Sequence, residues 1–203
     1  MRTPLFLATF LAAFIATPSG AQVPDADYQI AAAEMALPTA LKEKAGVFGH
    51  VDSVDDEMQE LRSGDDLLVC RVGRIEGERL NVFCLPESMQ PLMKRFRELR
   101  DGGMEFDEAT ETLQAEIKDG QLATPPSLAI GYAYRGADGS YGQNLDEVKQ
   151  HASRWQLVMT PFATAEKLNL PDKPEGSMPW LMAAGTGFAH IMVYGDPAAN
   201  LEP

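Results

Sequence analysis

Positive charge and cysteine are both scarce in this chain. It carries 17 Lys and Arg residues against 30 Asp and Glu residues, a formal net charge of −13, and it has two cysteines. Nucleic acids and anionic membrane surfaces bind to positively charged faces, so the charge balance argues against both as partners. After residue 21 no run is apolar enough to cross a bilayer, so we expect no membrane span in the mature chain.

The short motifs of common enzyme classes are also missing. The sequence has no phosphate-binding loop, no dinucleotide fingerprint, no His-Glu-x-x-His and no paired metal-binding cysteines. The acidic run 52–57 beside His50 lacks the spacing of a calcium loop, and segment 139–142 lacks that of a serine nucleophile elbow. We therefore expect no cofactor and none of the usual metal sites.

The first 21 residues have the pattern of a secretory signal peptide. Arg2 gives a positive start, an apolar core covers residues 5–16, and small residues at 19–21 suit a cleavage site. The pattern predicts that residues 1–21 are a signal peptide and that the protein is periplasmic or secreted. The mature chain has the usual length of one domain, so we predict a single α+β domain over residues 22–203.

Both cysteines lie in one predicted β-hairpin, over residues 67–84. A turn centred on Gly77 places Cys70 opposite Cys84 and Val72 opposite Val82. Directly opposed strand residues are close enough for a disulfide, and that bond is favoured outside the cytoplasm. The alternative is a reactive dithiol, which the absence of a Cys-x-x-Cys motif disfavours. We therefore predict a structural disulfide between Cys70 and Cys84.

The rest of the chain alternates between helical and strand patterns. Helices are predicted over 27–36, 39–45, 87–100, 107–118, 145–154 and 164–170, and strands over 47–51, 127–134 and 156–160. The helices over 87–100 and 107–118 carry opposite charge and are joined by a short loop, which favours an αα-hairpin. In that hairpin the first helix's basic cluster (Lys94, Arg95, Arg97 and Arg100) would be an internal partner rather than a binding patch. The predicted fold class is α+β, a mainly antiparallel sheet with an αα-hairpin and further helices packed on it.

The most apolar part of the mature chain is a second predicted hairpin, over residues 178–194. It reverses at Gly185-Thr186-Gly187, which places Met182 opposite His190 and Trp180 opposite Met192. Both of its faces are apolar, which predicts a central position covered on each side. One face gathers aromatic and sulfur-containing side chains around a histidine: Trp180, Met182, Phe188, His190, Met192 and Tyr194.

These six residues are the candidate ligand-binding site. Their chemistry favours a non-enzymatic module that binds a small hydrophobic ligand or an envelope protein. One alternative is a hydrolase with His190 as general base, which needs a carboxylate to orient the ring. Another is Cu(I) binding by Met182, His190 and Met192, because thioether and imidazole ligands suit that ion. The plainest alternative is a buried neutral histidine in a core.

The order of these motifs resembles a family of small exported bacterial proteins with no assigned activity. The resemblance rests on Leu61-Arg62-x-Gly64, then Cys70 and Cys84, then the helical pair, and a closing Gly185-Thr186 followed by His190-Ile-Met-Val193. The chain departs from that pattern at residues 65–69, where the family has an Asn-Gly and aromatic stretch. The resemblance implies no function, but it implies that Cys70, Cys84 and His190 are parts of one shared sequence pattern.

Overall fold

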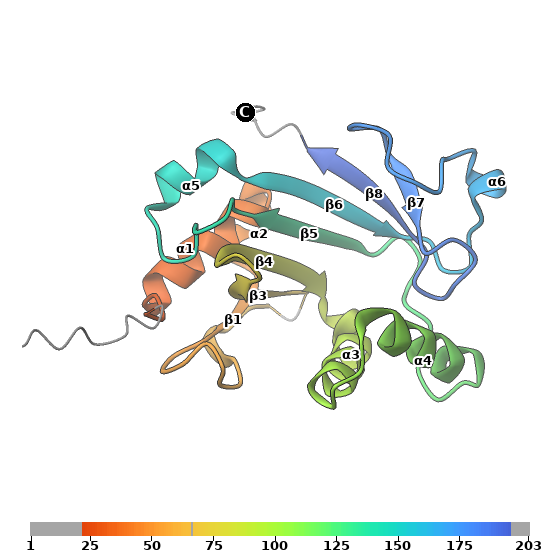
Figure 1. Cartoon of the computed structure of the whole chain (residues 1–203), viewed down its shortest axis with the longest axis horizontal. Coiled ribbons are helices and arrows are strands. Elements are labelled where there is room, and N and C mark those ends of the chain that lie inside the picture. The colour runs from red at the N-terminus through yellow and green to blue at the C-terminus, as the bar shows by residue number, and fades with distance from the viewer. Residues whose placement is uncertain (1–21, 66, 196–203) are drawn as a thin grey trace, which may run out of the picture.

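One eight-stranded sheet organises the protein. The computed structural model describes residues 22–65 and 67–195, so the predicted signal peptide lies outside the described residues. The strand order is β2-β1-β3-β4-β5-β6-β8-β7, and all neighbours are antiparallel except β1 and β3. Helices lie on both faces of this sheet (Figure 1), so the fold class is α+β, as predicted.

The elements follow the chain in this order. The strands are β1 (Gly46–Gly49), β2 (Gln59–Arg62), β3 (Leu68–Ile75), β4 (Arg79–Pro86), β5 (Ile130–Arg135), β6 (Ser153–Met159), β7 (Trp180–Met182) and β8 (His190–Gly195). The helices are α1 (Ala26–Ala36), α2 (Thr39–Lys42), the short 3₁₀ helix η1 (Glu87–Met89), α3 (Gln90–Asp101), α4 (Phe106–Lys118), α5 (Leu145–His151) and α6 (Ala165–Leu168). Among the described helices, none has both the length and the apolar character that a membrane span requires.

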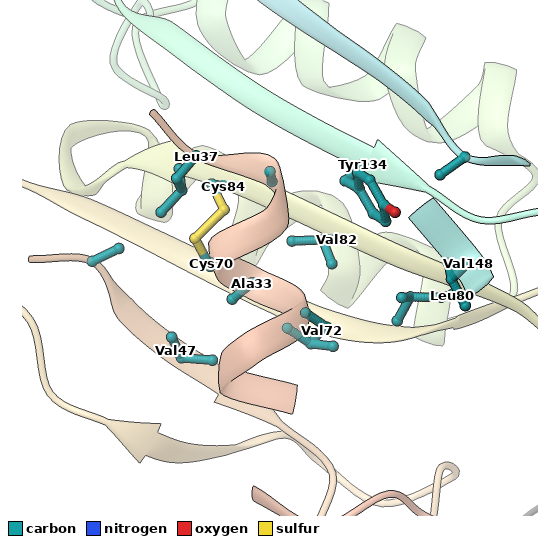
Figure 2. Packing of buried hydrophobic residues seen from close by; sticks show 14 of the residues in the cluster. Ala33, Leu37, Val47, Cys70, Val72, Leu80, Val82, Cys84, Tyr134 and Val148 are labelled. Atoms are coloured by element: carbon teal, nitrogen blue, oxygen red, sulfur yellow. A yellow bond between two sulfur atoms is a disulfide. The ribbon is translucent and has the colours of Figure 1, made fainter. Parts of the chain in front are cut away.

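Helix α1 covers one face of the sheet, which we call the α1 face. The helix presents buried alanines to the sheet, and these small side chains allow close packing. Valines of β1, β3 and β4 and the disulfide lie beneath them (Figure 2). The buried amide of Gln29 fixes the helix to the end of β1. It donates to the carbonyl oxygen of His50 at 2.7 Å and accepts from the backbone N–H of the same residue at 3.0 Å.

The disulfide hairpin has the predicted register. Strands β3 and β4 pair Cys70 with Cys84 and Val72 with Val82, and the two cysteines are bonded. The turn between the strands uses the left-handed region at Gly77 (φ 78°), where glycine carries no steric cost. Period-two alternation and the cysteine pair therefore defined this element correctly from sequence.

Helices α3 and α4 form the predicted αα-hairpin on the opposite sheet face (Figure 1), which we call the helix-pair face. Between these helices, the Arg95 guanidinium donates to both carboxylate oxygens of Glu116, and Nη2 lies 2.6 Å from Oε1. This ion pair lowers the pKa of Glu116. Arg95 is therefore an internal partner, as predicted for the basic cluster, whereas Arg97 forms no ion pair with the described residues.

The second predicted hairpin is present, but its position in the sheet differs from the prediction. Met182 pairs with His190 and Trp180 with Met192, as expected. The predicted central position is wrong, because β8 pairs with β6 on one side and leaves the three-residue β7 as the edge strand. The hairpin therefore lies at one edge of a wide sheet rather than in its middle.

Two further segments differ from the prediction. The helix expected to reach residue 154 ends at His151, because Ala152 is extended and the next residue, Ser153, already pairs with Arg135 of β5. Strand β2 was not predicted, since its sequence Gln-Glu-Leu-Arg is mostly polar, and it lies half exposed at the other edge of the sheet. In both segments the secondary structure is determined by pairing with strands that are distant in the sequence.

Candidate functional site

Five of the six predicted site residues project from one face of the hairpin. Alternation along β7 and β8 places Trp180, Met182, His190, Met192 and Tyr194 on the helix-pair face. The sixth, Phe188, lies in the loop between the strands. The predicted set is thus brought together, and its members are partly buried apart from Met192, which is buried.

Helix α4 covers part of this group. The Gln114 side chain of α4 accepts a hydrogen bond from the backbone N–H of Gly187 at 2.8 Å, which anchors the hairpin loop to the helix. Met192 belongs to the same buried cluster as Leu113 and Ile117 of α4. Much of the predicted site is therefore also core packing beneath the helix pair.

His190 is oriented by the backbone. Its Nδ1 lies 2.6 Å from the carbonyl oxygen of Phe188, which accepts the ring N–H when Nδ1 is protonated. Burial lowers the pKa of His190, so the neutral ring is favoured at neutral pH. Among the described residues no carboxylate hydrogen-bonds to this ring, so the orienting acid that a hydrolase would need is not provided by them.

A row of side chains crosses the helix-pair face, and three of its members, Phe83, Trp155 and Tyr194, also pack against the buried cluster beneath the helix pair. The pairing registers place one residue from each of six strands side by side, and we call this set the transverse row: Phe48, Arg71, Phe83, Ala133, Trp155 and Tyr194. Four members are aromatic, and every member except the buried Ala133 is partly exposed. The row extends the predicted hairpin site through Tyr194 across most of the sheet.

Two arginine guanidinium groups lie over aromatic rings of this row. The Arg71 guanidinium carbon is 5.6 Å from the centre of the Phe48 ring, and that of Arg135 is 5.0 Å from the Trp155 ring. Such stacking fixes the plane of the guanidinium while leaving its N–H edge free for other partners. Arg135 also donates to the Asn81 side chain at 3.2 Å.

Two open hollows lie elsewhere. One, of about 610 Å³, is lined by residues at the start of α1 and by His50, and the other, of about 360 Å³, by Tyr28 and the segment before α5. None of their lining residues belongs to β7 or β8. The acidic run after His50 forms an exposed turn, and the His50 Nδ1 lies 3.1 Å from the Asp56 carbonyl oxygen.

The sequence does contain a signal for part of the transverse row, in the residues next to the two cysteines. Once Cys70 and Cys84 are paired on the α1 face, their neighbours Arg71 and Phe83 must lie opposite each other on the other face. The continuation to Trp155 and Tyr194 depends on the strand order, which local patterns do not give.

Comparison with protein families, with curated proteins and with solved structures finds no match for this chain. The resemblance to small exported bacterial proteins therefore stays a prediction.

Proposed function

We propose that this protein is an exported, non-enzymatic binding module that holds an apolar ligand on its helix-pair face. The observation that carries the proposal is the transverse row, which crosses six strands and contains four partly exposed aromatic side chains. A monomer normally covers such an apolar strip or uses it for binding. The disulfide supports the exported location, since such bonds persist in oxidising compartments.

The first test is binding of Nile red, an uncharged dye whose emission rises in apolar surroundings. We expect the native protein to bind it with micromolar affinity and Trp155→Ala to weaken binding about tenfold, because a tenfold change corresponds to roughly 1.4 kcal/mol and burying an aromatic side chain contributes at least that. Dye titration followed by fluorescence, with circular dichroism to confirm folding, measures both.

Ile130→Ala is the matched control. Ile130 is 43% exposed and lies on the same sheet as the row, but alternation along β5 places it on the α1 face. Its removal should leave the dye affinity within twofold of the native value. Equal losses in both variants, or no dye binding by the native protein, would reject the proposed binding face.

A second candidate function is Cu(I) binding by Met182, His190 and Met192. One observation favours it: Met182 lies directly opposite His190, and the His190 ring is held by a backbone carbonyl, as metal-bound histidines commonly are. We expect His190→Ala to abolish stoichiometric Cu(I) uptake measured by competition with a chromogenic chelator under reducing conditions. Equal uptake by the variant would end this candidate. The hydrolase alternative stays a prediction without further support.

A further inference from the structure

Three arginines on the helix-pair face lack a carboxylate partner. Five arginines of the described residues have an acidic oxygen within 4 Å: Arg62, Arg74, Arg79, Arg95 and Arg100. Within the same residues, Arg71, Arg97 and Arg135 on the helix-pair face have none, and neither has Arg154 on the α1 face. Three of the four arginines without an ion pair among the described residues therefore lie on the helix-pair face.

Arg71 of β3 and Arg97 of α3 come from elements that meet at Phe83, which is paired with Arg71 across the strands and packs against the buried cluster beneath α3. Burial, and to a smaller extent the positive charge of Arg97, lower the pKa of Arg71 to about 10. Burial likewise lowers the pKa of Arg97. Glu57 favours the charged form of both, but it is exposed and forms no ion pair with either. Two partly desolvated cations that repel each other are stabilised by an anion bound between them.

The surroundings of Arg71 give this anion site an apolar neighbour. On one side Arg71 stacks on Phe48, and on the other it is paired across the strands with Phe83. From there the transverse row continues to Tyr194, four strand spacings or roughly 19 Å from Arg71. The arrangement is a charged end followed by an apolar track, which matches a ligand with an anionic head and an apolar tail.

We propose that Arg71 and Arg97 bind the carboxylate of an amphiphilic ligand whose apolar part lies along the transverse row. This inference rests on the proposed function and adds the chemical class of the ligand. Guanidinium groups donate pairs of N–H bonds to carboxylate oxygens, and the stacked, partly buried Arg71 is held ready to do so. Arg135, two residues along β5 from the row, adds positive charge near Trp155.

The test compares decanoate with decanol, which has the same chain without the charge. Binding to the native protein is measured by isothermal titration calorimetry at pH 7.5 and below the micellar concentration of each probe. We expect decanol to bind at least tenfold more weakly than decanoate. Arg97→Gln and Arg71→Gln should each weaken decanoate binding at least tenfold and leave decanol binding unchanged.

Lys94→Gln is the matched control, because Lys94 is an exposed cation on the same helix as Arg97. It should change decanoate affinity less than twofold. Arg97→Gln keeps the test decisive if the strand residue Arg71 proves necessary for folding. The anion site would be overturned if decanoate still bound after both arginine substitutions, or if decanoate and decanol bound equally well. The proposed apolar binding face would remain in either case. If neither decanoate nor decanol binds while Nile red does, the anion site is also overturned. If none of the three probes binds, the proposed function is overturned as well.

Discussion

Loss of the disulfide should lower the free energy of unfolding by about 3 kcal/mol, the chain-entropy value for a loop of this size. Cys70 and Cys84 are separated by 14 residues, and both are fully buried under α1. Replacing both with alanine removes the cross-link and leaves two small side chains in the same core. For a chain of this length the melting temperature should fall by roughly 6–12 °C.

The measurement is urea unfolding of the native protein and of the double alanine variant, each with and without a strong thiol reductant. Reductant should bring the native protein to the stability of the variant and should not affect the variant, which has no cysteine left. A variant within 1 kcal/mol of the native protein would show that the core alone fixes this hairpin.

Gly64→Ala should destabilise the protein by about 3 kcal/mol, at the upper end of typical overpacking costs. A β-carbon at this position would lie 2.2 Å from the backbone nitrogen of Gly46 and 2.6 Å from the carbonyl oxygen of Lys44. Both are backbone atoms, which cannot move aside as a flexible side chain can. The same carbonyl accepts the backbone N–H of Asp65 at 2.9 Å, so a shift would also cost that hydrogen bond.

Gly46→Ala is the control for this prediction. Gly46 faces Gly64 across the same contact, but a β-carbon there would meet its nearest atom at 3.6 Å, an ordinary packing distance. Its stability should stay within about 1 kcal/mol of the native value, as for substitutions without strain. Thermal and urea unfolding of the two variants side by side measure the difference. Equal stabilities would contradict the close backbone approach.

The same segment gives a physical meaning to Leu61-Arg62-x-Gly64. The Arg62 guanidinium donates to the carbonyl oxygens of Ala45 and Lys42 and forms an ion pair with Glu34 of α1 at 2.6 Å. Together with Gly64 it ties β2 to the turn between α2 and β1. This motif therefore has a structural role, and the transverse row on the other sheet face does not involve it.

Local patterns predicted the two hairpins but not their places in the sheet. The register of β3 and β4 follows from alternation and the cysteine pair, and that of β7 and β8 from the glycine turn. The strand order depends on pairing between segments far apart in sequence, such as β6 with β8, and no local period encodes it. The edge position of β7 was missed for this reason.

The basic cluster of α3 shows a similar limit. In the sequence its arginines form one basic group, but Arg95 and Arg97 are two residues apart and so point about 200° apart around the helix. Arg95 therefore reaches Glu116 of α4, while Arg97 acts on Arg71 of β3. The candidate anion site became visible only when the helix was placed on the sheet.

We expect ligands to bind along the transverse row rather than at the edge strand β7, and the two tryptophans test this directly. Trp155 belongs to the row, whereas Trp180 pairs with the buried Met192 and has a buried indole nitrogen. Decanoate should change the emission of Trp155 in a Trp180→Phe variant and leave the emission of Trp180 unchanged in a Trp155→Phe variant. A response from Trp180 alone would place the ligand at the edge strand β7 and contradict binding along the transverse row.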